Sequence, residues 1–184
     1  MKNYKVQDLM VPLSEYATVS EDATLLEAVN ELEKAQGDFD HTRYRHRAVM
    51  VLDKNGAVIG KLSQLDVLKA LEPKYDKMLD QSRLHRFGFT KGFMKSLLTE
   101  YQLFDRPLTD ICSKAAVKNV KKFMYSPTEG EYIDENATLD EAIHQLVLGH
   151  HQSLLVTGGE GISGVLRLTD VFAAVFQVMK KCQV

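Results

Sequence analysis

Gly60-Lys61-Leu62-Ser63-Gln64-Leu65-Asp66-Val67 is the stretch that decides the fold, because it returns 104 positions later as Gly164-Val165-Leu166-Arg167-Leu168-Thr169-Asp170-Val171. Apolar residues precede each copy, and apolar residues at helical spacing follow it. This pattern predicts a strand that turns directly into a helix. Two such corners indicate that the chain is built from an internal repeat.

A second pair of matching segments supports the repeat. Asp22–Ala28 recurs as Asn136–Ala142, 114 positions later. The same offset pairs Val6 with Val120 and Met10 with Met124. Because the offset falls from 114 to 104, the first copy carries ten extra residues, which we place around Glu33–Arg47. We therefore expect two copies related by a pseudo-twofold axis.

Composition indicates an ordinary globular protein. The 184 residues are 45% hydrophobic and 26% charged, and the net charge of −2 neither favours nor excludes a nucleic-acid partner. Cys112 and Cys182 have neither metal-type spacing nor the pattern of a disulfide framework, so we expect a reducing, cytoplasmic setting. The N-terminus opens no apolar signal segment, and no apolar run approaches the roughly 20 residues of a membrane span.

Strands and helices alternate in both copies. Thr24 with Glu27, and Thr138 with Glu141, have the spacing of capping boxes that begin helices. Asn55-Gly56 between apolar runs predicts a hairpin. We expect a second turn at Thr157–Gly161 and strands at Ala17–Val19, Ala48–Leu52, Ala57–Ile59, Ser153–Val156 and Ile162–Leu166. The fold class is therefore α/β, with a small sheet and packed helices in each repeat.

Glu72–Asn119 separates the copies and is too long and too apolar for a simple linker. The spacing of its apolar residues over Phe93–Tyr101 predicts a helical insert of two or three helices. Lys and Arg are in excess over Lys74–Lys95, which is typical of a solvated helix face. Nucleic-acid binding through this basic stretch is a weaker alternative.

The order of strand, capped helix, strand, hairpin, strand, Ser-x-x-Asp and helix resembles the CBS domain, and two copies in tandem resemble a Bateman module. The resemblance covers Val6–Leu71 and about Val120–Val178. It divides the chain into repeat 1 at residues 1–71, an insert at 72–119 and repeat 2 at 120–184. The chain departs from the family where Met50 and Leu154 stand at a frequent proline, and where Arg167 replaces the usual Ser or Thr.

The resemblance implies a regulatory module rather than an enzyme. Such pairs bind adenosine-containing ligands such as AMP, ADP, ATP or S-adenosylmethionine in clefts between the repeats, require no cofactor, and commonly form dimers. We accordingly expect a homodimer that signals to an unidentified protein effector and binds neither nucleic acid nor membrane. The implied ligand-binding positions are Asp66 and Asp170 for the ribose, Ser63 for phosphate, and Thr18, Val19, Tyr132, Ile133, Arg47 and Ser153 around the base.

The residues themselves leave alternatives open. Ser63 and Asp66 also have the spacing of an ordinary helix-capping pair. Arg167 begins a helix whose dipole it opposes, so it faces either a ligand phosphate or a carboxylate such as Asp170. The second functional interpretation is a structural or interaction module whose clefts are empty or filled by side chains.

Two groups of basic or imidazole side chains carry weaker signals. Arg43, Arg45 and Arg47 would share one face of an extended segment, as a solvated edge or as an anion-facing strip. His151 aligns with Arg47 at the 104-residue offset, which favours a place at the ligand's edge. With His144 and His150 it is otherwise a packing or hydrogen-bonding residue rather than a metal ligand. No nucleophile with a base and no phosphate-binding loop is evident, so we expect no catalysis.

Overall fold

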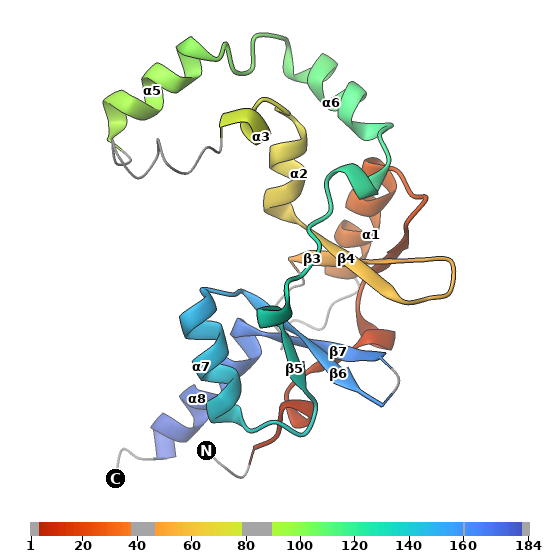
Figure 1. Cartoon of the computed structure of the whole chain (residues 1–184), viewed down its shortest axis with the longest axis vertical. Helices are drawn as coiled ribbons and strands as arrows, with labels where there is room; N and C mark the ends of the chain where they lie inside the picture. The colour runs from red at the N-terminus through yellow and green to blue at the C-terminus, as the bar shows by residue number, and fades with distance from the viewer. Residues whose placement is uncertain (1–3, 38–46, 79–89, 160, 182–184) are drawn as a thin grey trace.

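The computed structural model describes residues 4–37, 47–78, 90–159 and 161–181. Its strands form two sheets, one in the upper and one in the lower half of Figure 1. The first has the strand order β2-β3-β4 and the second β1-β7-β6-β5. The strands are β1 Val11–Pro12, β2 Thr18–Ser20, β3 Ala48–Leu52, β4 Val58–Ser63, β5 Tyr132–Asp134, β6 Ser153–Gly158 and β7 Gly161–Arg167.

The two sheets share one pairing pattern, which confirms the repeat. β3 runs parallel to β2 and antiparallel to β4, and β6 has the same relation to β5 and β7. Each hairpin carries a bulge, which follows Val51 in the first repeat and Val156 in the second. These registers make the offset between β3 and β6 105 residues. Nine of the ten extra residues therefore precede β3, and the tenth lies in the first hairpin rather than around Glu33–Arg47.

Helices of both repeats cover the outer faces of the sheets, and the helices of the insert extend away from them (Figure 1). They are α1 Leu25–Gly37, α2 Gln64–Ala70, α3 Tyr75–Met78, α5 Lys91–Glu100, α6 Leu108–Ala116, α7 Leu139–Gly149 and α8 Leu168–Lys181. Both expected capping boxes are present: the backbone N–H of Thr24 donates to Glu27 at 2.7 Å, and that of Thr138 donates to Glu141 at 2.7 Å. The sequence therefore placed the start of α1 and of α7 correctly.

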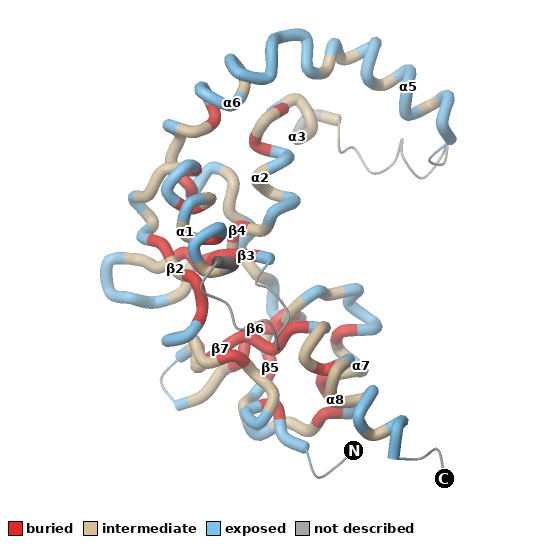
Figure 2. The backbone as a smooth tube through the Cα atoms, turned by 180° about the vertical axis from the view of Figure 1, so that it is seen from behind, coloured by how far each residue is buried: buried red, intermediate tan, exposed pale blue. Residues whose placement is uncertain are grey.

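The two sheets pack against each other through their inner faces. Successive side chains of a strand point to opposite sides, so Val49 and Val51 join the core under α1 while Met50 faces the other sheet. Leu155 does the same in repeat 2. The core between the sheets consists of Val11, Tyr16, Met50, Leu155 and Val165. Figure 2 shows the strands of both repeats as the buried centre of the molecule.

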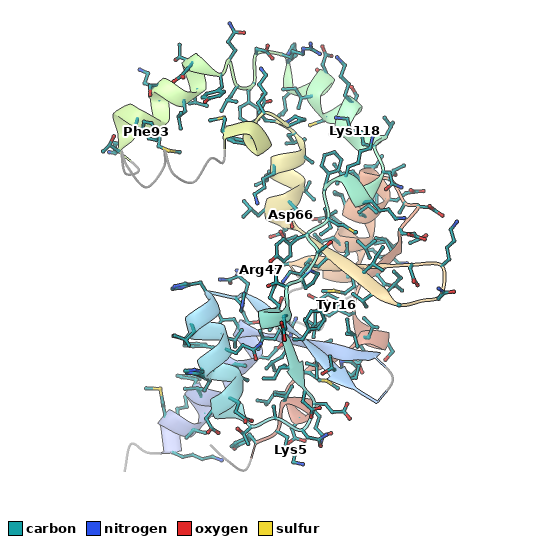
Figure 3. The ribbon with its side chains drawn as sticks, viewed as in Figure 1. Lys5, Tyr16, Arg47, Asp66, Phe93 and Lys118 are labelled. Carbon is teal, nitrogen blue, oxygen red and sulfur yellow. The ribbon has the colours of Figure 1, made fainter. Side chains whose placement is uncertain are left out.

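The segment that precedes each repeat packs on the other repeat. The N–H of Val6 donates to Ala137 at 3.0 Å, and Val6 lies in the core of repeat 2. The N–H of Val120 donates to Ala23 at 2.9 Å, and Val120 lies in the core of repeat 1. In Figure 3, Lys5 accordingly lies beside repeat 2 and Lys118 beside repeat 1. The boundaries of the repeats in the sequence are thus not the boundaries of the packed units.

The insert is helical, as its apolar spacing predicts. α5 and α6 arch away from the sheets in Figure 1, and Figure 2 shows them largely exposed. Within the insert, Glu72 is 5% exposed and accepts the N–H of Phe104 at 2.8 Å, and the end of the insert is tied to repeat 1 where the N–H of Leu25 donates to the Lys118 carbonyl at 2.8 Å. No helix in the described parts of the chain combines the length and apolarity that a membrane crossing requires.

Two expectations about connections need comment. The turn expected over Thr157–Gly161 is shorter, because β6 continues through Gly158 and β7 begins at Gly161. The strip of three arginines falls mostly on residues 38–46, which lie outside the described residues. Of its members only Arg47 can be placed.

Candidate functional site

A cleft of about 480 Å³ lies where the two repeats meet. This volume is within the range of small-molecule sites. Both corners line it, together with the entries of β3 and β6. Its walls are Tyr16, Arg47, Ala48, Lys61, Ser63, Gln64, Leu65, Asp66, Tyr125, Glu131, His150, His151, Gln152, Ser153, Arg167, Leu168 and Thr169. Figure 3 shows Tyr16, Arg47 and Asp66 in this region.

The cleft brings together about half of the residues that the sequence nominated. Those that line it are Arg47, Ser63, Asp66, His151, Ser153 and Arg167, whereas Thr18, Val19, Tyr132, Ile133 and Asp170 are not among its walls. Both corners contribute to the walls of this one cleft: Ser63 and Asp66 mark its first end and Arg167 its second.

At the first corner, Ser63 and Asp66 form a capping box on α2. The Ser63 N–H and hydroxyl both donate to Oδ2 of Asp66, at 2.9 and 2.6 Å, and the Asp66 N–H donates to the Ser63 hydroxyl at 3.2 Å. This confirms the capping interpretation of the pair. Asp66 nevertheless remains part of the cleft wall.

At the second corner, Arg167 and Asp170 form a bidentate ion pair. Nε and one terminal nitrogen of Arg167 each donate to a different carboxylate oxygen, both at 2.6 Å. This fork is the strongest geometry available to an arginine and a carboxylate. Arg167 is 6% exposed and is part of the cleft wall, whereas Asp170 is half-buried and is not among the walls. Of the two open interpretations of Arg167, the structure shows the carboxylate partner.

Tyr16 lies beside this second corner and was not singled out from the sequence. It is 8% exposed, and burial raises its pKa to about 12, with Arg167 opposing the rise and Asp170 adding to it. The phenol is therefore neutral at physiological pH. A lone tyrosine ahead of a short strand carries no signal in the sequence, because its position depends on how the repeats pack.

A second ion pair crosses between the repeats at the first corner. Lys61 of β4 donates to Oε1 of Glu131 at 2.6 Å, and Glu131 ends the 3₁₀ turn Glu129–Glu131 before β5. The Thr128 N–H donates to Oε2 of Glu131 at 3.1 Å, and the Lys61 ammonium lies 5.3 Å from the centre of the Tyr125 ring. The sequence did not reveal this ion pair, because Lys61 and Glu131 are 70 positions apart in the chain.

Burial is the largest influence on the pKa of Glu131 and would raise it. The hydrogen bonds from Lys61, from the Tyr125 hydroxyl and from the Thr128 N–H together outweigh burial and leave the pKa below its usual value. Glu131 is 2% exposed and is therefore a buried carboxylate at neutral pH. The pKa of Tyr125 is raised mainly by its hydrogen bond with Glu131 and, as the second cause, by burial.

The remaining nominated positions have structural roles. Val19 and Ile133 are buried in the cores of repeat 1 and repeat 2. The carbonyl of Tyr132 accepts from Gln145 at 2.9 Å, so this main-chain group is already engaged. Thr18 holds the first register position of β2 against Met50.

The alignment of His151 with Arg47 is wrong. The Arg47 carbonyl accepts the N–H of Gln64 at 3.0 Å, and the corresponding bond in repeat 2 runs from Leu168 to the Gln152 carbonyl at 3.0 Å. Gln152 is therefore the counterpart of Arg47, since the offset here is 105. The register of the sheets was needed to see this.

The histidines near this cleft pack rather than cluster. His150 ends α7 in the left-handed conformation, with φ at 51°. A Cβ on Gly149 would lie 2.0 Å from Nε2 of His151, so the ring of His151 covers the glycine. Within the described ranges, no three His, Cys, Asp or Glu side chains are grouped as a metal site would require.

The model of the CBS domain family matches residues 6–73 and 118–177. Comparison with curated proteins finds no match. Solved structures that share the fold include the CBS-pair protein CBSX2 from Arabidopsis thaliana, at 20% identity and TM-score 0.61, covering 96% of this chain and 97% of that one. A CBSX2 complex with AMP has 19% identity and TM-score 0.59, covering 96% and 98%. The putative acetoin utilization protein AcuB from Vibrio cholerae has 16% identity and TM-score 0.60, covering 96% and 93%.

Proposed function

The chain belongs to the CBS domain family, and from this premise we propose that it is a regulatory module that binds an adenosine-containing ligand in the cleft between its repeats. The ligand class is an adenine nucleotide such as AMP, ADP or ATP, or S-adenosylmethionine. Ligand state would pass to a separate protein effector in a reducing, cytoplasmic setting. No catalytic family is indicated by the comparisons, and we propose a binding protein rather than an enzyme.

The observation that carries this proposal is the convergence of both corners on one cleft. Ser63 and Asp66 come from the first corner and Arg167 comes from the second, 104 positions after Ser63, and nevertheless all three line the same space. A cleft whose walls mix hydroxyl, carboxylate and guanidinium groups with apolar surface suits a nucleoside phosphate. CBSX2, which shares this fold, has a structure in complex with AMP.

A structural or protein-interaction module is the second candidate, and a specific observation favours it. The polar groups of both corners already have internal partners: Asp66 caps α2, Arg167 is paired with Asp170, and Lys61 with Glu131. A ligand would have to compete with these contacts. The cleft would then be a stable contact between repeats rather than a binding site.

We propose that the module is a homodimer. The helices that follow the two corners leave large apolar side chains exposed: Leu65 and Leu68 of α2 are 61% and 60% exposed, and Phe172 and Met179 of α8 are 60% and 63% exposed. The α8 residues recur at helical spacing and form one stripe with Phe176. Contiguous apolar surface of this kind marks an interface on a soluble protein. A second copy is the occupant that we expect.

Calorimetric titration tests the proposed function directly. The intact protein would be titrated with AMP, ADP, ATP and S-adenosylmethionine, with guanosine and GTP as controls for the base. Saturable binding of at least one adenosine compound, and weaker binding of the guanosine compounds, supports the sensor. Absence of binding by all of them supports the structural module. We expect no tight binding of nucleic acid, because the excess of Lys and Arg over Lys74–Lys95 is typical of a solvated helix face.

A further inference from the structure

The ion pair between Lys61 and Glu131 breaks the pseudo-twofold symmetry of the cleft. In the second repeat, Val165 holds the place of Lys61, as the register shows: Lys61 pairs with Tyr125 as Val165 pairs with Val11. The counterpart of Glu131 is Ala17, since each residue directly precedes the strand that runs parallel to the central strand. The network therefore exists at the Ser63 end of the cleft and has no equivalent at the Arg167 end.

The fold does not require this ion pair. Val165, Val11 and Ala17 are buried at 0%, 6% and 9% exposure, so apolar side chains fill the equivalent space on the other side of the axis. A buried ion pair gains little stability over well-packed apolar residues, because both charges must be desolvated. Lys61 and Glu131 occur on just one side of the axis, where the other side has Val165 and Ala17. This difference points to a role in ligand binding by the cleft.

The charges at the two ends differ in consequence. At the Ser63 end, Glu131 holds the ammonium of Lys61, Lys69 lies 3.8 Å from Asp66, and Arg47 also belongs to the cleft wall. At the other end Arg167 lines the cleft and is paired with Asp170, which is not among the cleft walls. An anionic ligand group that approaches Lys61 has to displace Glu131, which would leave a buried carboxylate without its cation.

We propose that Glu131 sets the charge preference of the Ser63 end of the cleft, and that Lys61 is a phosphate-binding group which Glu131 keeps occupied. The inference rests on the proposed function, because it concerns the same cleft. With Glu131 in place, Lys61 is not available to the phosphates of a ligand. Once the Glu131 carboxylate is neutralised, the Lys61 ammonium is available to a phosphate from inside the wall of the cleft.

Three variants test this proposal. Glu131→Gln keeps the size of the side chain, removes the charge and replaces one of the two acceptor oxygens by an NH2 donor. Glu129→Gln makes the same change two residues earlier, at an exposed position in the same turn. Lys61→Val with Glu131→Ala copies the apolar residues found across the axis, and therefore guards against a misfolded single variant. Each protein is titrated with adenosine, AMP, ADP and ATP, and its fold is checked by circular dichroism.

The measured quantity is the affinity for ATP divided by that for adenosine. We expect Glu131→Gln to raise this ratio by about ten- to hundredfold, the scale of a charged hydrogen bond. The ratio should change by no more than about threefold in Glu129→Gln, because an exposed charge acts weakly. The double variant should also fail to gain ATP preference, since Lys61 is gone. A ratio in Glu131→Gln equal to that of Glu129→Gln, while adenosine still binds, overturns the inference alone. Loss of all adenosine binding in every folded protein, wild type included, overturns the proposed function and the inference with it.

Discussion

The sulfur of Met10 lies 2.9 Å from the position that a Cβ on Gly164 would occupy, and the carbonyl oxygen of Val11 lies only 2.6 Å from it. The equivalent glycine of repeat 1, Gly60, meets the sulfur of Met124 at 2.8 Å and the carbonyl oxygen of Tyr125 at 3.0 Å. Because these two glycines have no side chain, the segment that precedes the other repeat can approach the strand closely: Met10 and Val11 approach β7, and Met124 and Tyr125 approach β4. The first residue of the repeated motif is a glycine for this reason.

Alanine at these glycines should destabilise the protein unequally. We expect Gly164→Ala to cost about 2–3 kcal/mol of unfolding free energy, at the upper end of overpacking effects, because the clash includes backbone. Gly60→Ala should cost less, since the flexible Met124 side chain is its nearest neighbour. Gly130→Ala is the matched control, because nothing lies within 4 Å of its Cβ position. Urea unfolding measures all three, and an equal loss for Gly164→Ala and Gly130→Ala would contradict the close approach.

The sequence predicted what local chemistry determines. Capping at Thr24 and Thr138, the hairpin at Asn55-Gly56 and the strands at Ala48 and Ser153 all depend on neighbouring residues, and all are present. The pairing of Val6 with Val120 identified equivalent residues correctly. It did not reveal that each enters the core of the opposite repeat, because offset alone does not say which copy a segment packs against.

The cleft was predictable only in part for the same reason. Ser63, Asp66 and Arg167 belong to a repeated motif and were found by comparing the copies. Glu131 and Lys61 have no matching partners in the other copy, so a search for repeats passes over them. Their importance lies in that difference, which becomes visible once the register of β4 with Tyr125 is known.

Acid should destabilise the protein partly through Glu131. Its pKa is lower in the folded state than in the unfolded chain, so the stability that it contributes is present above its unfolded pKa and is lost as pH falls through the folded pKa. Glu131→Gln should therefore show a shallower loss of unfolding free energy below about pH 4.5 than wild type. Thermal unfolding between pH 7 and pH 3 checks this. If stability falls with pH as steeply in Glu131→Gln as in wild type, but less steeply in Glu129→Gln, then another carboxylate causes the acid sensitivity.

Alkali should destabilise the protein through Tyr16. Its folded pKa of about 12 lies above the ordinary value of 10.0, so its contribution is complete below pH 10 and is lost as pH rises toward 12. The expected loss over this window is about 2–3 kcal/mol. Tyr16→Phe cannot ionise and should show a flatter profile. Spectrophotometric titration of the tyrosines provides the second measurement: wild type should show one more late-ionising phenol than Tyr16→Phe, in which Tyr125 still has a raised pKa.

The proposed dimer should depend on the exposed stripe of α8. Replacing Phe172 with Glu places a charge at the start of that stripe and should shift the protein toward a monomer of 20.8 kDa at micromolar concentration. Gln177→Glu adds the same charge to the same helix at an exposed polar position and is the control. Sedimentation equilibrium distinguishes the species. A wild-type protein that sediments as a monomer would rule out the dimer, and one that stays dimeric in Phe172→Glu would place the interface elsewhere.

Arg167 provides the sharpest test of ligand recognition at its end of the cleft. The guanidinium holds Asp170 at 2.6 Å through two nitrogens, but it also forms the wall, so phosphate would bind the surface of an arginine already oriented by its carboxylate. Arg167→Ala should then weaken ATP by about 1.5–3 kcal/mol, the scale of a charged hydrogen bond, and adenosine far less. The same change leaves Asp170 buried without its cation, which costs up to about 3–5 kcal/mol of stability, so binding must be measured where urea unfolding shows each variant to be folded. Asp170→Asn keeps the shape of the side chain and should weaken adenosine, AMP and ATP alike, if the carboxylate serves the ribose that all three share.

Arg106→Ala is the control: it removes an exposed arginine outside the cleft and should change the affinity for none of the three ligands. Equal losses for adenosine and ATP in Arg167→Ala would show that the arginine only supports the corner, whereas a loss that grows with each phosphate would place the phosphate chain on its guanidinium.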